Sequence, residues 1–257
     1  MNAGNNHRRK FLKTITGAVG GAAIFHGLPF DAYSKSPSAT NGINYTFLFQ
    51  GDSITDGNRT RDNDWNHVMG HGYAYLIASR LWYDQPAKKF HFFNRGISGN
   101  KVSDLEKRWD TDTIAINPDL VSILVGVNDV AAEVSQNTGI NATKFEEGYR
   151  NILNSTKAKL PSAQIVICEP FILPVGYVNN NWELWQEKMK TKQAVTRQLA
   201  KEFNAIYVPL QESFSKACEK AAASYWIWDG VHPMPAGHEL IARKWISVVK
   251  NELSFIV

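Results

Sequence analysis

From residue 45 to the end of the chain, short apolar runs of strand length alternate with longer amphipathic segments of helical length. This alternation is typical of an α/β domain in which helices connect parallel strands and cover both faces of the sheet. The apolar runs predict five strands, at 45–50, 89–93, 120–125, 164–168 and 205–208. The amphipathic segments predict helices at 72–82, 102–109, 144–159, 183–203, 211–223 and 236–253. Ligands bind at the carboxyl ends of the strands in such folds, so functional side chains are expected directly after strand ends.

The first 34 residues differ from the rest and are interpreted as an export signal. The stretch RRKFLK at 8–13 resembles a twin-arginine signal, and a Gly/Ala-rich, moderately apolar stretch follows it. The residues AYS at 32–34 are suited to cleavage. A basic amphipathic surface helix is the alternative, but four glycines between 17 and 27 disfavour it. The sequence therefore predicts an exported, periplasmic or extracellular protein, with a linker at 35–43 and one domain at 44–257.

Most of the net charge lies in this leader. Its four basic residues and one acidic residue carry +3 of the formal net charge of +4, which leaves the remaining chain at +1. A domain so close to neutral gives no support for binding nucleic acid or, once the signal is removed, an anionic membrane. Cys168 and Cys218 lack metal-binding spacing; free thiols are expected, and a disulfide between them, which export would permit, is the alternative. His67 and His71 have no third ligand beside them, so neither a metal nor another cofactor is predicted.

Polar clusters follow the first three predicted strands and precede the last helix. They lie at 51–55, 94–100, 126–129 and 229–233. Ser53 is a candidate nucleophile, or simply the N-cap of the helix that follows it. A nucleophilic serine needs a base, and His232 is the candidate, with Asp229 placed to hold its other ring nitrogen. The alternative is a structural histidine beside an aspartate that caps a turn.

Acyl transfer also needs hydrogen-bond donors for the developing oxyanion, each worth about 3 kcal/mol. Asn128 offers a side-chain amide and Ser53 its own backbone N–H. A glycine can bring its N–H close to a ligand, and spacing alone allows either Gly96 or Gly99 to do so. A turn glycine and a loop asparagine are the common alternatives for these residues.

Taken in order, these blocks resemble the SGNH (GDSL) hydrolase family over most of residues 44–250. The resemblance implies a flavodoxin-like three-layer α/β/α sandwich and metal-independent ester hydrolysis. Three stretches look more specifically like bacterial acetylxylan esterases and related carbohydrate deacetylases. They are NRGISGNKVSDLEKRWDTD, SILVGVND and WDGVHPMPAGHELIARKW.

The resemblance also implies roles for individual residues. The implied catalytic triad is Ser53, His232 and Asp229, and the implied oxyanion donors are Ser53, Gly99 and Asn128. Gly99 is preferred to Gly96 because the key glycine of the family precedes a polar residue.

Aromatic residues gather in or beside the loops expected around the serine. They are Trp65, Tyr73, Tyr177, Trp182, Trp185, Trp226 and Trp228. Sugar rings stack on such side chains, although any one of them can instead belong to the core. Substrate contacts are predicted from Trp228, Trp182, His71 and Asp52.

The residues and the resemblance together predict an exported serine esterase that removes O-acetyl groups from a polysaccharide or oligosaccharide. A lysophospholipase, thioesterase or arylesterase on the same fold is one alternative. A catalytically silent carbohydrate-binding protein is another. The resemblance also allows a homo-oligomer, and no feature of the sequence sets its number of subunits.

Overall fold

The computed structural model describes residues 44–62, 64, 66–136 and 141–253. The predicted export signal at 1–34 and the linker at 35–43 lie outside the described residues, and so does Trp65.

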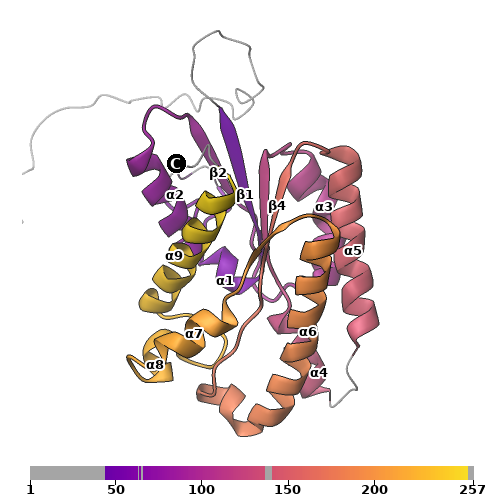
Figure 1. Ribbon diagram of the computed structural model, residues 1–257, viewed down its shortest axis with the longest axis vertical. Coiled ribbons are helices and arrows are strands. Elements are labelled where there is room, and N and C mark those ends of the chain that lie inside the picture. The colour runs from indigo at the N-terminus through magenta and orange to yellow at the C-terminus, as the bar shows by residue number, and fades with distance from the viewer. Residues whose placement is uncertain (1–43, 63, 65, 137–140, 254–257) are drawn as a thin grey trace, which may run out of the picture. The chain divides into compact units, whose positions relative to one another are not determined.

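A five-stranded parallel sheet forms the centre of the described domain, in the order β2-β1-β3-β4-β5 (Figure 1). Its strands are β1 (Tyr45–Gly51), β2 (Phe90–Asn94), β3 (Leu120–Leu124), β4 (Gln164–Cys168) and β5 (Ile206–Val208). The chain runs outward from β1 to β2 and then returns to place β3 on the other side of β1. This is the flavodoxin-like order, with its switch point between β1 and β3. The predicted parallel sheet is confirmed.

Helices connect the strands and cover the sheet. They are α1 (Ser53–Asp56), α2 (Tyr73–Asp84), α3 (Val102–Trp109), α4 (Val127–Ser135), α5 (Ala142–Lys159), α6 (Trp182–Glu202), α7 (Gln211–Ala217), α8 (Ala223–Trp226) and α9 (Pro235–Glu252). A π-helical turn, Asp110–Ile114, extends α3, and a 3-10 helix, Gly176–Asn181, leads into α6. Within the described ranges, none of the helices combines the length and the apolar character needed to cross a bilayer.

The alternation of side chains along the strands produces two cores, one on each face of the sheet. On β1, Phe47 and Phe49 pack with residues of α2 and α9, whereas Leu48 packs with residues of α3 and α5. The two pairs of helices accordingly lie on opposite sides of the sheet (Figure 1). Both cysteines are free thiols, with Cys168 buried in the first of these cores and Cys218 partly exposed. The three-layer α/β/α arrangement is confirmed.

Two helical segments differ from the sequence prediction. The predicted helix at 211–223 ends early, at Ala217, and a separate short helix, α8, begins only at Ala223. The chain turns between them, and buried Ile227 after α8 forms a bridge with Pro233. A helix that was not predicted, α4, begins directly after β3. Gly126 allows this abrupt entry with a φ of 135°, so Asn128, expected in a loop, lies in the first turn of a helix.

A buried ion pair joins α4, α5 and α6. Lys192 on α6 is 0% exposed, and its Nζ donates to Glu133 Oε1 at 2.6 Å and to the Asn141 carbonyl at 3.2 Å. The ammonium also lies 5.2 Å from the centre of the Phe145 ring. A charge removed this completely from water depends on its counterion.

We expect Glu133→Gln to lower the free energy of unfolding by about 3 kcal/mol, because the Lys192 ammonium would stay buried without its counterion. Urea unfolding followed by circular dichroism measures the change. Lys216→Met is the matched control, since Lys216 and its partner Glu212 are each 68% exposed in their ion pair. Such exposed pairs contribute at most about 1 kcal/mol. Equal losses in the two variants would contradict the prediction.

Candidate active site

Ser53 lies at the switch point of the sheet, directly after β1. It is the first residue of the short helix α1, and the side chain of Asp52 caps this helix by accepting from the Ile54 N–H at 3.0 Å. Gly57 ends the helix in the left-handed conformation. The serine itself is therefore not the capping residue, which leaves its hydroxyl available for another partner.

A relay of hydrogen bonds joins the three residues proposed as a triad. Ser53 Oγ lies 2.8 Å from His232 Nε2, and His232 Nδ1 lies 2.6 Å from Asp229 Oδ2. A carboxylate can only accept, so the proton of the neutral imidazole lies on Nδ1. His232 Nε2 is then the acceptor of the Ser53 hydroxyl. The arrangement can take up the serine proton when the oxygen attacks an electrophile.

The charges of this relay follow from its hydrogen bonds. The hydrogen bond to Asp229 raises the pKa of His232, against the opposing effect of burial. Burial alone would raise the pKa of Asp229, but the His232 side chain and two backbone N–H groups lower it overall. Those N–H groups belong to Val231 and His232 and donate to Asp229 Oδ1 at 2.9 and 2.7 Å. Asp229 is thus an ionised carboxylate aimed at the imidazole.

The structure distinguishes the two glycines that spacing left open. A Cβ on Gly96 would lie 2.3 Å from the Asp56 backbone N, and the Gly96 N–H already donates to Asn94 Oδ1 at 2.9 Å. Gly99 has a φ of 82°, and a Cβ there would have no atom within 4 Å. Within the described ranges, the Gly99 N–H has no acceptor. Gly96 therefore serves close packing, and Gly99 remains available as a donor.

Asn128 is anchored beside this loop. Its Nδ2 donates to the Asn100 carbonyl at 3.1 Å, which uses one of the two amide hydrogens. The second hydrogen remains available to a ligand. Position in the first turn of α4, rather than in a flexible loop, limits the movement of this side chain.

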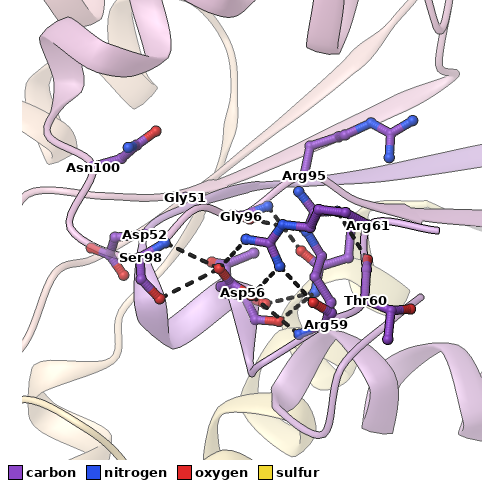
Figure 2. A network of polar contacts seen from close by, with 12 residues as sticks. Gly51, Asp52, Asp56, Arg59, Thr60, Arg61, Arg95, Gly96, Ser98 and Asn100 are labelled. Atoms are coloured by element: carbon purple, nitrogen blue, oxygen red, sulfur yellow. Dashed lines mark hydrogen bonds and ion pairs between the residues drawn. The ribbon is translucent and has the colours of Figure 1, made fainter. Parts of the chain in front are cut away.

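Sequence reasoning missed a network of charged residues around the loop at 96–100 (Figure 2). Asp56 on α1 accepts from Ser98 and Arg61, and Arg59 Nε donates to the Gly96 carbonyl at 3.0 Å. From α3, Arg108 donates to the Asn100 side chain at 2.9 Å and to the Arg95 carbonyl at 2.8 Å. These residues appear in the sequence only as single arginines and an aspartate, and nothing in the sequence shows which of them pair.

The four residues expected to contact substrate lie in different environments. Trp228 is 60% exposed and stacks against the His232 ring, with centroids 6.0 Å apart and an interplanar angle of 22°. His71 is also exposed. Asp52, by contrast, is 1% exposed, its side chain caps α1, and burial raises its pKa to about 7; a direct substrate contact by Asp52 stays a prediction.

Trp182 lies on a different pocket, of about 390 Å³, between α6 and the α7 region. No residue of the relay and neither Gly99 nor Asn128 lines that pocket. A substrate contact by Trp182 stays a prediction. Among the other aromatic residues, Tyr73 and Trp185 are buried in the core.

Comparison with known proteins connects this geometry to known chemistry. Residues 49–240 match the GDSL-like lipase/acylhydrolase family. A curated acetylxylan esterase from Geobacillus stearothermophilus is 31% identical over 217 residues, which cover 82% of this chain and 96% of the relative.

Solved structures show the same likeness. A crystal structure described as a GDSL-like lipase, from Parabacteroides merdae, has a TM-score of 0.77 at 38% identity and covers 83% of this chain and 99% of its own. The crystal structure of the Geobacillus stearothermophilus acetylxylan esterase has a TM-score of 0.72 at 31% identity, covering 81% and 95%.

The relay predicts how His232 titrates. We expect its pKa to lie above the ordinary value of about 6.5, and to fall in Asp229→Asn, because the carboxylate that favours the imidazolium is lost. NMR of the histidine ring protons across pH measures both values. His238 is the internal control, because burial lowers its pKa to about 4 and it should stay neutral in both proteins. An unchanged His232 titration in the variant would contradict the relay.

Proposed function

The chain belongs to the GDSL-like lipase/acylhydrolase family, and from that premise we propose that Ser53, His232 and Asp229 form the catalytic triad of a carbohydrate O-acetyl esterase. Membership of this family and the similarity to the curated acetylxylan esterase show that the chain is a carboxylic ester hydrolase similar to acetylxylan esterases. A catalytically silent binding protein is therefore set aside. The triad, the substrate and export are the parts that we propose.

The relay from Ser53 Oγ through His232 to Asp229 carries the proposal, at 2.8 and 2.6 Å. His232 Nε2 takes the hydroxyl proton while Ser53 Oγ bonds to the acetyl carbonyl carbon. The tetrahedral oxyanion is stabilised by the N–H groups of Ser53 and Gly99 and by the Asn128 amide. His232 then gives its proton to the departing sugar oxygen as the ester bond breaks, leaving acetyl-Ser53.

Water completes the cycle by the same groups. His232 removes a proton from water, whose oxygen attacks the acetyl carbonyl, and then returns the proton to Ser53 Oγ as acetate leaves. Ionised Asp229 stabilises the imidazolium in both halves of the reaction. No step requires a metal or a cofactor.

Variants of the similar acetylxylan esterase support these roles. Structures of that enzyme described as catalytic mutants replace a serine, a histidine, and an aspartate three residues before that histidine with alanine. Asp229 and His232 have the same spacing and residue types in this chain.

The glycan substrate is proposed from the relatives and from Trp228. That side chain stacks on the imidazole that protonates the departing sugar oxygen, and it is exposed. An aromatic surface at this position suits a sugar ring. We propose acetylated xylan or its oligosaccharides as the substrates. The leader at 1–34 resembles an export signal, so we also propose that the enzyme is exported to reach them.

We expect Ser53→Ala to reduce acetate release from acetylated xylan at least about 1,000-fold, because no other group replaces the nucleophile. Ser135→Ala, at the exposed end of α4, is the control and should keep wild-type activity. Loss of release in Ser53→Ala alone supports the nucleophile and the substrate class together. Equal release by Ser53→Ala and wild type would contradict the triad.

A series of esters with acyl chains of increasing length separates acetyl esterase activity from lipase or thioesterase activity, since the proposal requires acetyl esters to be preferred.

We expect Trp228→Ala to raise KM for acetylated xylo-oligosaccharides about threefold to tenfold, the value of one lost aromatic contact. KM for a small acetate ester without a sugar should stay constant. Tyr83→Ala is the matched control, because Tyr83 is an aromatic side chain on α2 that is 87% exposed. A KM that rises equally for both kinds of ester would show that Trp228 does not contact the sugar.

A further inference from the structure

Asp56 is a buried carboxylate that the mechanism does not use, three residues after Ser53 on α1. We propose that Asp56 is a positioning residue of the reaction, which fixes the 96–100 loop against the helix that carries Ser53. This inference rests on the proposed function, because the 96–100 loop affects the reaction only through the Gly99 N–H, the proposed oxyanion donor. Asp56 itself contacts neither Ser53 Oγ nor His232 among the described residues.

Both oxygens of Asp56 accept from backbone N–H groups on different segments. Asp56 Oδ1 accepts from the Arg59 N–H at 3.1 Å, and Oδ2 accepts from the Ser98 N–H at 3.1 Å (Figure 2). The Ser98 hydroxyl adds a longer contact to Oδ2, at 3.4 Å. The carboxylate therefore joins the end of α1 to the residue directly before Gly99.

The other side of Gly99 is fixed as well. The Asn100 carbonyl accepts from the Asn128 amide at 3.1 Å, and the Asn100 N–H donates to the Ile97 carbonyl at 3.1 Å. Gly99 has no side chain and a φ of 82°, so its own packing does not set the direction of its N–H. That direction follows from the hydrogen bonds at Ser98 and Asn100. Release of the Ser98 bond would remove the contact nearest to Gly99 on that side, and the next one is the bond from the Ile97 N–H to the Gly51 carbonyl, at 3.1 Å.

Arg61 keeps Asp56 in the form that this role requires. Its guanidinium donates to Asp56 Oδ1 at 3.1 Å and to Oδ2 at 2.6 Å, a bidentate pair. Burial alone would raise the pKa of Asp56, but Arg61 and the backbone donors at Ser98 and Arg59 lower it overall. Only the ionised carboxylate accepts at both oxygens, which both backbone bonds need. The Arg61 side chain is 51% exposed, so the charge is supplied from the surface.

Asp56→Asn tests the role directly. An amide can accept at one of the two positions, and its NH2 then faces a donor at the other, so one backbone bond is lost whichever way it turns. We expect kcat for a small acetate ester to fall about 100-fold with KM changed less than about threefold, because a misplaced donor costs the transition state more than the bound substrate. Active-site titration normalises each rate to the folded, reactive fraction. Asp110→Asn is the matched control, since it breaks an exposed ion pair with Lys159 and should keep wild-type kcat.

Arg61→Met keeps the inference testable if Asp56→Asn does not fold, because Arg61 is half-exposed. We expect a threefold to tenfold lower kcat, the net value of about one hydrogen bond. Arg61 acts through Asp56, so adding Arg61→Met to a folded Asp56→Asn protein should change kcat no further. Independent, multiplying losses in the double variant would overturn the coupling.

Amide hydrogen exchange gives a readout that does not depend on turnover. Peptides covering residues 97–100 should exchange about tenfold faster in Asp56→Asn than in wild type, with peptides of α5 unchanged. Unchanged exchange at 97–100 would overturn the inference, as would faster exchange with an unchanged kcat. If wild-type turnover does not depend on Ser53, the proposed function is overturned, and the positioning role of Asp56 falls with it. If turnover depends on Ser53 but is unchanged in Asp56→Asn, only this inference is overturned.

Discussion

The site depends on a close approach of three backbones at the carboxyl end of β1. A Cβ on Gly51 would lie 2.3 Å from the Leu124 carbonyl of β3, and a Cβ on Gly96 would lie 2.3 Å from the Asp56 N of α1. Only glycine permits either approach. The end of β3 therefore packs against the end of β1, and the loop after β2 packs against the helix that begins at Ser53. Each of the three polar clusters arrives at the same point because the strands that precede them are neighbours in the sheet.

Close packing brings the segments together, but charge sets the details of their orientation. On one side Asp56 and Arg61 hold Ser98, and on the other Arg108 holds the side chain of Asn100. The Asp56 and Arg108 side chains are only 4% and 14% exposed, so either would be costly without its partners, whereas Arg61 is half-exposed. These charges therefore favour one arrangement of the loop over its alternatives. The proposed oxyanion donor, the Gly99 N–H, needs such support, because preorganisation is what makes a donor effective.

The sequence predicted the strands and most of the longer helices, and it singled out the residues of the relay. The five predicted strands each overlap an observed strand, and α3 has the predicted bounds, because the apolar period directly reflects burial. The pattern of Ser53, His232 and Asp229 could be recognised because Asp229 and His232 share one short loop.

Contacts between segments that are distant in the chain could not be predicted from the sequence. The choice between Gly96 and Gly99 depends on what a Cβ would touch, and the pairing of Asp56 with Ser98 spans 42 positions along the chain. The helix α4 was missed because a glycine normally suggests a turn rather than a direct entry into a helix.

Two buried aspartates near His232 have pKa values shifted in opposite directions by their surroundings. Asp229 receives three hydrogen bonds, two from backbone N–H groups and one from the imidazole, and its pKa is lowered. Asp52 receives the Ile54 N–H, and burial raises its pKa to about 7. Near neutral pH the imidazole therefore faces one fully ionised carboxylate, and Asp52 titrates close by. A second full charge beside His232 would stabilise the imidazolium further and, in the proposed mechanism, make it a poorer donor to the departing oxygen. The Asp52 side chain thus caps the helix that begins at Ser53, and its burial limits the negative charge that it adds beside His232.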